Sequence, residues 1–158
     1  MTATLNHTTP STHAAGETSR TIRAQERLRP AALAGLRVVA SFLFVLHGLQ
    51  GLIGLFGGID GHGAAIALLA WPGWWASVLE LVAGGLVLLG LYTRQAGLLC
   101  SGAMAYAYFT VHQPIALFPL ENMGEPAVLY CWIFLLFAVT GAGPYGLDAI
   151  RARRNGRS

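Results

Sequence analysis

Polar and ionisable side chains interrupt the long apolar stretches of this sequence. His47 and Gln50 lie in the first stretch, Glu80 lies in the second, and Tyr108 and His112 lie in the third. An ionisable group inside a membrane costs at least about 2.5 kcal/mol on insertion scales, so it usually faces a bundle interior and serves a function. A carboxyl and an imidazole can exchange protons with a bound molecule. These residues therefore predict proton-handling chemistry.

The helical rise predicts that these groups share one half of a bundle. His47 would lie ~13 Å, and Glu80 ~10 Å, below the same outer surface, with His112 at the outer rim. We expect an outward-facing pocket in which Glu80, His47 and His112 are the catalytic groups. The residues predicted to bind the substrate are Gln50, Tyr108, Asn122 and Glu125.

A pocket of this kind suits a small lipophilic or anionic redox molecule, such as the head group of a quinone, because quinone carbonyls exchange protons with carboxyl and imidazole groups. A structural alternative stays open, in which Glu80 only forms an interhelical hydrogen bond with His47 or Gln50. Quinone is the only cofactor that these residues suggest.

Other cofactors fit the sequence less well. A haem held by two histidines needs them at matching depth, whereas His47 and His112 would differ by ~11 Å along the bundle. The His and Glu residues near the outer rim follow no known metal-ligand spacing. Cys100 and Cys131 would lie ~15 Å apart, beyond the ~7 Å limit for a disulfide. No haem, flavin or metal site is evident.

The composition places the chain among membrane proteins. Of its 158 residues, 54% are hydrophobic and 11% are charged, against about 25% charged in soluble domains. The mean hydropathy is +0.55. The net charge is +3, and the ten basic residues lie mostly in short segments at the two ends rather than on a folded basic face. This distribution excludes nucleic acid as a partner and predicts contact with the lipid bilayer.

Four apolar stretches approach the ~20 residues that a membrane-spanning helix needs. They cover residues 33–56, 73–92, 95–113 and 126–141. The first is too long for the apolar core of a signal peptide. Arginines precede the first stretch, lie between the second and third, and follow the fourth, so the positive-inside rule predicts that both termini are cytoplasmic. The fold class is an all-α membrane protein with a four-transmembrane-helix bundle.

The sequence divides into three parts. Residues 1–30 form a polar, Arg-containing segment that we expect to be disordered. Residues 31–148 form the membrane domain, and residues 149–158 form a basic cytoplasmic tail. Gly and Ala residues recur at helical spacing in the first three stretches, which predicts close helix packing. The small bundle is also compatible with a homodimer.

Seven short segments, taken in order, resemble the DoxX family of small bacterial membrane proteins (DoxX/DoxD-like). They are Phe44–Gln50, Leu79–Gly85, Leu88–Arg94, Tyr108–Pro114, Phe118–Glu125, Val128–Phe134 and Gly141–Asp148. The chain departs from the family at Gly51, where Lys is frequent, at Ala142, where Pro is usual, and at Gly146, where Ser is usual.

The resemblance implies a protein of the bacterial inner membrane and a link between sulfur compounds and quinone. Relatives include the membrane subunit of thiosulfate:quinone oxidoreductases, and others are associated with thiol and oxidative-stress systems. We expect either a quinone-linked redox protein or the membrane subunit of such a complex, with a soluble redox or sulfur-transfer enzyme as partner. The alternatives are a non-catalytic anchor or assembly factor and a small proton-coupled exporter.

Overall fold

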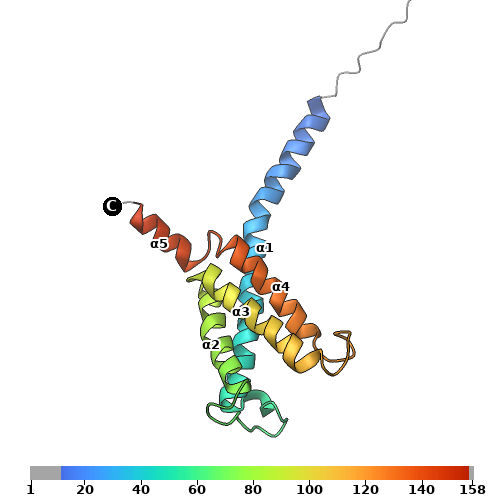
Figure 1. Ribbon diagram of the computed structural model, residues 1–158. Helices are drawn as coiled ribbons and strands as arrows, with labels where there is room; N and C mark the ends of the chain where they lie inside the picture. Colours follow the sequence, from blue (N-terminus) through green and yellow to red (C-terminus); the bar gives the residue numbers. More distant parts are fainter. Residues whose placement is uncertain (1–11, 157–158) are drawn as a thin grey trace, which may run out of the picture.

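Helices make up the regular structure of the chain. The computed structural model describes residues 12–156 (Figure 1). The helices are α1 (Thr12–Ile53), α2 (Gly73–Leu89), α3 (Thr93–Ala107), α4 (Glu125–Thr140) and α5 (Leu147–Asn155). A 3₁₀ turn at Leu55–Gly57 follows α1, and a π-helical turn at Tyr108–His112 continues α3. Residues 12–156 contain no β-strand, which confirms the all-α class.

Helices α1 to α4 run alternately up and down and pack as two pairs. Extensive contacts join α1 to α2 and α3 to α4, fewer join α2 to α3, and very few join α1 to α4. The loops 54–72 and 113–124 lie at one end of the bundle, here called the loop end (Figure 1). The opposite end, here called the α5 end, carries α5 and the protruding first half of α1.

Glycines allow the two tightest helix crossings. A Cβ atom on Gly48 of α1 would lie 2.7 Å from the carbonyl oxygen of Ser77 and 2.8 Å from the backbone nitrogen of Leu81 on α2. A Cβ atom on Gly97 of α3 would lie 3.0 Å from the carbonyl oxygen of Phe134 on α4. Without side chains at these positions the helix backbones approach closely, which is how helices pack in lipid. Gly102, also expected at a helix contact, faces open space.

A small aromatic and aliphatic core joins the helices, while their outer faces are apolar and exposed. Phe44, Phe134 and Phe137 are among the largest fully buried side chains. Each of the four helices also exposes large apolar side chains, among them Val39 at 59%, Val82 at 58%, Leu98 at 61% and Val139 at 66%. Apolar exposure on every outer face is typical of a surface that contacts lipid.

One helix within residues 12–156 is long and apolar enough to cross a membrane. It is the part of α1 from Leu28 to Ile53, with 26 residues and a mean hydropathy of 1.8. Helices α2 and α4 are apolar but shorter, at 17 and 16 residues. The four helices begin and end within a few residues of the predicted stretches, apart from the beginning of α1 and the end of α3, which the π-helical turn at Tyr108–His112 continues toward the predicted end.

The beginning of α1 differs from the expectation that residues 1–30 are disordered. The helix begins at Thr12, so residues 12–30 are helical, and residues 1–11 lie outside the described part. This segment contains Ala, Arg, Glu and Gln, which have high helix propensity. It also continues directly from the apolar part of α1. Helix nucleation is the unfavourable step, and because that part is already helical, adding each further residue to the helix costs little free energy.

Arg37 joins α1 to the end of α2 in the interior of the bundle. Sequence reasoning counted this residue with the basic segment before the first span, but its side chain is only 3% exposed. Its guanidinium donates hydrogen bonds of 2.6 Å to the carbonyl oxygens of Val87 and Leu88. A cation at these carbonyls satisfies groups that the end of a helix leaves without partners.

Asp148 provides a second connection at the α5 end. Its carboxylate accepts hydrogen bonds from the backbone N–H groups of Tyr92 at 2.8 Å and Thr93 at 3.0 Å, where α3 begins. Its own N–H donates to the carbonyl of Gly90 at 2.8 Å. The segments Leu88–Arg94 and Gly141–Asp148 therefore hold each other, which gives a structural reason for both sequence motifs.

Candidate functional site

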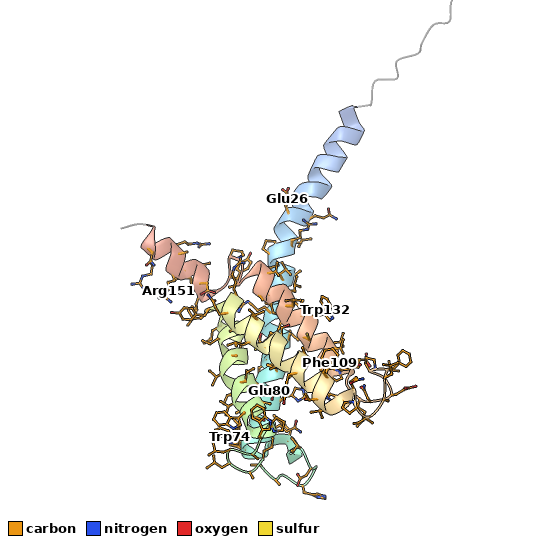
Figure 2. All side chains as sticks on the ribbon, in the orientation of Figure 1. Glu26, Trp74, Glu80, Phe109, Trp132 and Arg151 are labelled. Carbon is orange, nitrogen blue, oxygen red and sulfur yellow. The ribbon has the colours of Figure 1, made fainter. Side chains whose placement is uncertain are left out.

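Glu80 lies where α2 crosses α1, in the half of the bundle toward the loop end (Figure 2). A Cβ atom on Gly48 would lie 3.2 Å from the Cβ atom of Glu80, so the bare helix backbone of α1 covers the base of this side chain. The Glu80 carboxyl interacts electrostatically with Cys100 on α3 and with Tyr130 on α4. One partly buried carboxyl group on α2 therefore contacts α1 and acts through its charge on residues of α3 and α4.

The Glu80 carboxylate has no hydrogen bond or ion pair with any side chain or backbone group in the described part of the chain. The structural alternative, a hydrogen bond from His47 or Gln50 to Glu80, does not occur there. A partly buried carboxyl group without such a partner destabilises the fold. Ionisable residues in membrane helices are therefore usually kept for a function, which makes Glu80 a candidate functional residue.

Tyr130 is a neighbour of Glu80 that the sequence analysis did not select. Its ring lies 5.2 Å from the ring of Phe44 and 6.1 Å, edge-on, from the imidazole of His47. It also stacks with Phe134 at 6.1 Å. A tyrosine in an otherwise apolar helix was the available signal, because a buried phenol O–H usually requires a polar neighbour.

His47 lies beside this centre but faces outward. Its side chain is exposed, on the side of α1 that faces Tyr130 of α4. Tyr130 thus lies beside an exposed imidazole and within range of the charge of the Glu80 carboxyl. The three groups form what we call the Glu80 centre: Glu80, Tyr130 and His47.

A groove between α1 and α4 leads to Tyr130. Its volume is about 450 Å³, and it lies where these two helices make their few contacts. The lining is mostly apolar, with Glu125 and Tyr130 as polar groups; it comprises Leu36, Val39, Ala40, Leu43, Glu125, Pro126, Leu129, Tyr130 and Ile133. Pockets of 300–1,000 Å³ with a few polar groups are typical ligand sites.

The other predicted site residues hold loops in place. The side-chain amide of Gln50 donates to the carbonyl of Gly58 at 2.9 Å, which fixes the loop after α1. Ring nitrogen Nδ1 of His112 lies 3.0 Å from the carbonyl of Asn122, and the Tyr108 hydroxyl donates to the carbonyl of Leu117 at 3.2 Å. These bonds give the residues clear structural roles.

Asn122 is the centre of the second loop. The side chain is 2% exposed, its amide nitrogen donates to the carbonyl of Ala116 at 2.8 Å, and its amide oxygen accepts from the N–H of Gly124 at 2.8 Å. Every polar atom of the side chain is thus engaged by loop backbone, which satisfies a buried polar group.

The predicted residues therefore do not form the single pocket that the depth argument suggested. Gln50, on α1, bonds to the loop 54–72, whereas Tyr108, His112 and Asn122 bond to the loop 113–124. The two loops lie apart at the loop end, because the α3–α4 pair diverges from α1 in that direction (Figure 1). Glu125, the first residue of α4, lines the α1–α4 groove together with Tyr130.

The two cysteines are free thiols. The Sγ atom of Cys131 lies 3.5 Å from the Oγ atom of Ser101, the residue that follows Cys100. The two cysteines are thus at similar depth, and the predicted offset of ~15 Å along the bundle is wrong. Among the side chains that the structure describes, no three His, Cys, Asp or Glu residues are grouped as metal ligands.

Comparisons with known proteins give a consistent family. The model of the DoxX family matches residues 32–113. An uncharacterized protein of Haemophilus influenzae is 42% identical over 130 residues, which cover 78% of this chain and 92% of that protein. A Bacillus subtilis protein named "Putative oxidoreductase CatD" is 30% identical over 123 residues, or 77% of this chain and 89% of that protein. No solved structure matches.

Proposed function

The chain belongs to the DoxX family of membrane proteins, and on this premise we propose that it donates electrons to quinone in the bacterial cell membrane. It would act alone or as the membrane subunit of a sulfur, thiol or oxidative-stress oxidoreductase. The Bacillus subtilis relative, whose printed name is that of an oxidoreductase, supports a redox role.

The proposal includes four membrane crossings with both termini in the cytoplasm. The exposed apolar faces of α1 to α4 support the four crossings, because such faces are stable in contact with lipid rather than with water. The charges support the orientation: Arg94, Arg151, Arg153 and Arg154 belong to the α5 end, and Asp60 and Glu121 to the loop end. Excess arginine marks the cytoplasmic side.

One observation carries the proposed function, namely the Glu80 carboxyl, which has no hydrogen-bond partner in residues 12–156 and whose charge acts on Tyr130, a residue that lines the groove between α1 and α4. The groove walls are apolar side chains that would accept a hydrophobic ring and tail. Its inner polar group is the Tyr130 phenol. A lipid-soluble molecule could therefore enter sideways, between the two helices that make the fewest contacts.

The residues present fit a quinone head group. Quinone would supply a two-electron, two-proton acceptor when bound. A reduced sulfur compound or thiol, free or on a partner enzyme, would give the electrons, and Glu80, reprotonated after the first transfer, would deliver both protons. The Tyr130 hydroxyl would donate a hydrogen bond to a ligand carbonyl, and the Glu80 carboxyl would hold and supply a proton. His47, exposed beside Tyr130, would connect this proton path to the surroundings of the helix.

A non-catalytic anchor for a redox enzyme is the second candidate. This candidate is favoured by the hydrogen bonds of Gln50, His112 and Asn122. These side chains already bond to the backbone of the loops, so they stabilise the loops instead of binding a ligand. The anchor would present these ordered loops to a soluble partner and would need neither Glu80 nor the groove.

Quinone content tests the choice between these functions. The protein is purified in mild detergent, and quinone in its lipid extract is measured by mass spectrometry for the wild type, Glu80→Gln, and Leu43→Trp, which fills the groove. Glu121→Gln, an exposed loop acid, is the matched control. We expect about one quinone per chain in the wild type and in the control, and a clear loss in the other two variants.

The opposite result is equally informative. Quinone at membrane background in the wild type would overturn the proposal. A stable co-purified partner enzyme under those conditions, unaffected by Glu80→Gln, would establish the anchor.

A further inference from the structure

A second groove lies at the α5 end, away from the Glu80 centre. Its volume is about 390 Å³, and it is lined by Leu91, Leu147, Ile150, Arg151, Arg154 and Asn155. Two guanidinium groups thus border the same hollow as three large apolar side chains. A purely soluble anion would use the arginines but leave these apolar side chains facing water.

Helical spacing gives α5 one face with this mixed character. Leu147, Ile150, Arg151 and Arg154 are related by i, i+3, i+4 and i+7 spacing, so they project from the same side of the helix. Arg153 lies outside the groove. Leu147 is 40% exposed and Ile150 53% exposed, so the apolar part of the groove is open.

The surrounding contacts hold this face in position. Asp148 binds the start of α3, as described above, and a Cβ atom on Gly146 would lie 3.0 Å from the carbonyl of Gly90. Arg151 donates a hydrogen bond of 2.8 Å to the Tyr92 hydroxyl, and its guanidinium carbon lies 5.3 Å from the centre of the Tyr92 ring. One N–H of Arg151 is used in this way, and a guanidinium has five N–H donors.

The position of α5 suits a membrane surface. It projects sideways from the bundle at the end where α2 ends and α3 begins (Figure 1). The apolar part of α1 begins at Leu28, on the same side. A helix with an apolar and basic face at such a boundary is typical of one that lies on the head groups of a bilayer.

We propose that the groove at α5 binds the phosphate group of an anionic phospholipid, with Arg151 and Arg154 on the phosphate and Leu91, Leu147 and Ile150 against the start of an acyl chain. The groove is lined by both basic and apolar side chains, which favours a lipid over free phosphate. A lipid carries a phosphate group next to an acyl chain, whereas free phosphate has no apolar part to cover the apolar side chains. The groove lining contains two arginines and no carboxylate, which selects an anionic lipid over a zwitterionic one. Asp148 interacts electrostatically with Arg151 from outside the lining, but its carboxylate is also held by the N–H groups at the start of α3. The inference is independent of the redox proposal.

Lipid retention tests this site. Protein in a neutral detergent is incubated with an equal mixture of phosphatidylglycerol and phosphatidylcholine and re-isolated, and its bound lipid is measured by mass spectrometry. Arg154→Gln is compared with Arg153→Gln, because each removes one exposed charge from α5. We expect the wild type to retain phosphatidylglycerol preferentially, with about fivefold less preference in Arg154→Gln and less than about twofold change in Arg153→Gln.

Two further arms identify the ligand. Ile150→Ser should lower retention of phosphatidylglycerol, whereas a site for phosphate alone would be unaffected by this change. Inorganic phosphate in millimolar excess should leave the bound lipid in place. The proposal is overturned if phosphate displaces the lipid, if both arginine variants lose the preference equally, or if neither does. The elution volume in size-exclusion chromatography checks that each variant is folded.

Discussion

The guanidinium of Arg37 on α1 donates a hydrogen bond of 2.6 Å to the carbonyl of Val87, 50 residues later, near the end of α2. A second bond of the same length goes to Leu88. The α1–α2 pair is therefore joined at the α5 end by a buried cation and, near Gly48, by close backbone packing. Glu80 lies at that second junction, so both contacts set the position of the candidate centre.

Replacing Arg37 by Gln should lower the stability of the bundle. Each hydrogen bond to a charged group contributes ~1.5–3 kcal/mol, and the carbonyls would lose a partner in the interior. We expect destabilisation by about 2–3 kcal/mol, measured as an earlier loss of tryptophan fluorescence on heating in detergent. Arg153→Gln removes an exposed charge and serves as the control. Equal melting temperatures for the two variants would contradict the role of Arg37.

Stability should decrease at low pH through Asp148. Burial works to raise the pKa of this carboxyl, but the N–H groups of Thr93 and Tyr92, together with Arg151, hold the pKa below its ordinary value. A folded-state pKa below the unfolded one gives stability that is present above about pH 4 and is lost as the pH falls through the folded pKa.

Melting temperatures of the wild type and Asp148→Asn, measured from pH 7 to pH 3, check this prediction. The wild type should be more stable at pH 7, by about 1 kcal/mol if the loss resembles that of a helix cap. The difference should shrink toward pH 3, because the wild-type carboxyl is then protonated. A difference that stays constant over this range would show that the charge of Asp148 contributes nothing.

A methyl group at Gly48 should separate α1 from α2. It would lie 2.7 Å from the Ser77 carbonyl oxygen, so the backbones would have to move apart, and overpacking of this kind costs about 1–3 kcal/mol. Gly102→Ala is the matched control, since a Cβ atom there meets nothing within 4 Å. We expect Gly48→Ala to melt earlier and Gly102→Ala to melt at the wild-type temperature or slightly above it. The reverse order would contradict the crossing at Gly48.

Tyr130→Phe tests the groove and the Glu80 centre together. The ring contacts with Phe44, His47 and Phe134 remain in this variant, so the melting temperature should change little. The phenol hydroxyl is lost, and we expect quinone retention or quinone-dependent turnover to fall about tenfold, as for a hydrogen bond worth ~1.4 kcal/mol. Tyr106→Phe, on an exposed part of α3, should retain the wild-type value. Equal retention in both variants would remove Tyr130 from the site.

The sequence predicted the helices well and the beginning of the first helix poorly. The bounds of α2, α3 and α4 follow from apolar runs that end at Gly, Pro or polar residues, and these signals are local. Residues 12–30 were expected to be disordered because their composition is polar. The structure continues α1 through them, since helix growth from an existing helix depends on the neighbouring segment and not on composition alone.

For the candidate site, the sequence selected Glu80 and His47 but grouped them with the wrong neighbours. Depth along a straight helix can be counted from residue numbers, and that count placed the candidate residues in one half of the bundle. Rotation about the helix axis and tilt between helices cannot be counted in this way. They direct Gln50 and Asn122 to different loops, bring Tyr130 within range of the charge of Glu80, and place Cys131 beside Ser101.

By itself, the sequence determined that this protein is helical, apolar and a member of its family, because composition, periodicity and short motifs are properties of the chain. Only the tertiary structure decided that the charge of Glu80 acts on Tyr130 and Cys100, that Arg37 is buried against α2, and that α1 and α4 leave a groove between them. Those outcomes depend on which helices pack closely. Glycines such as Gly48 and Gly97, with the size of the side chains opposite them, set that packing through contacts between residues far apart in the chain.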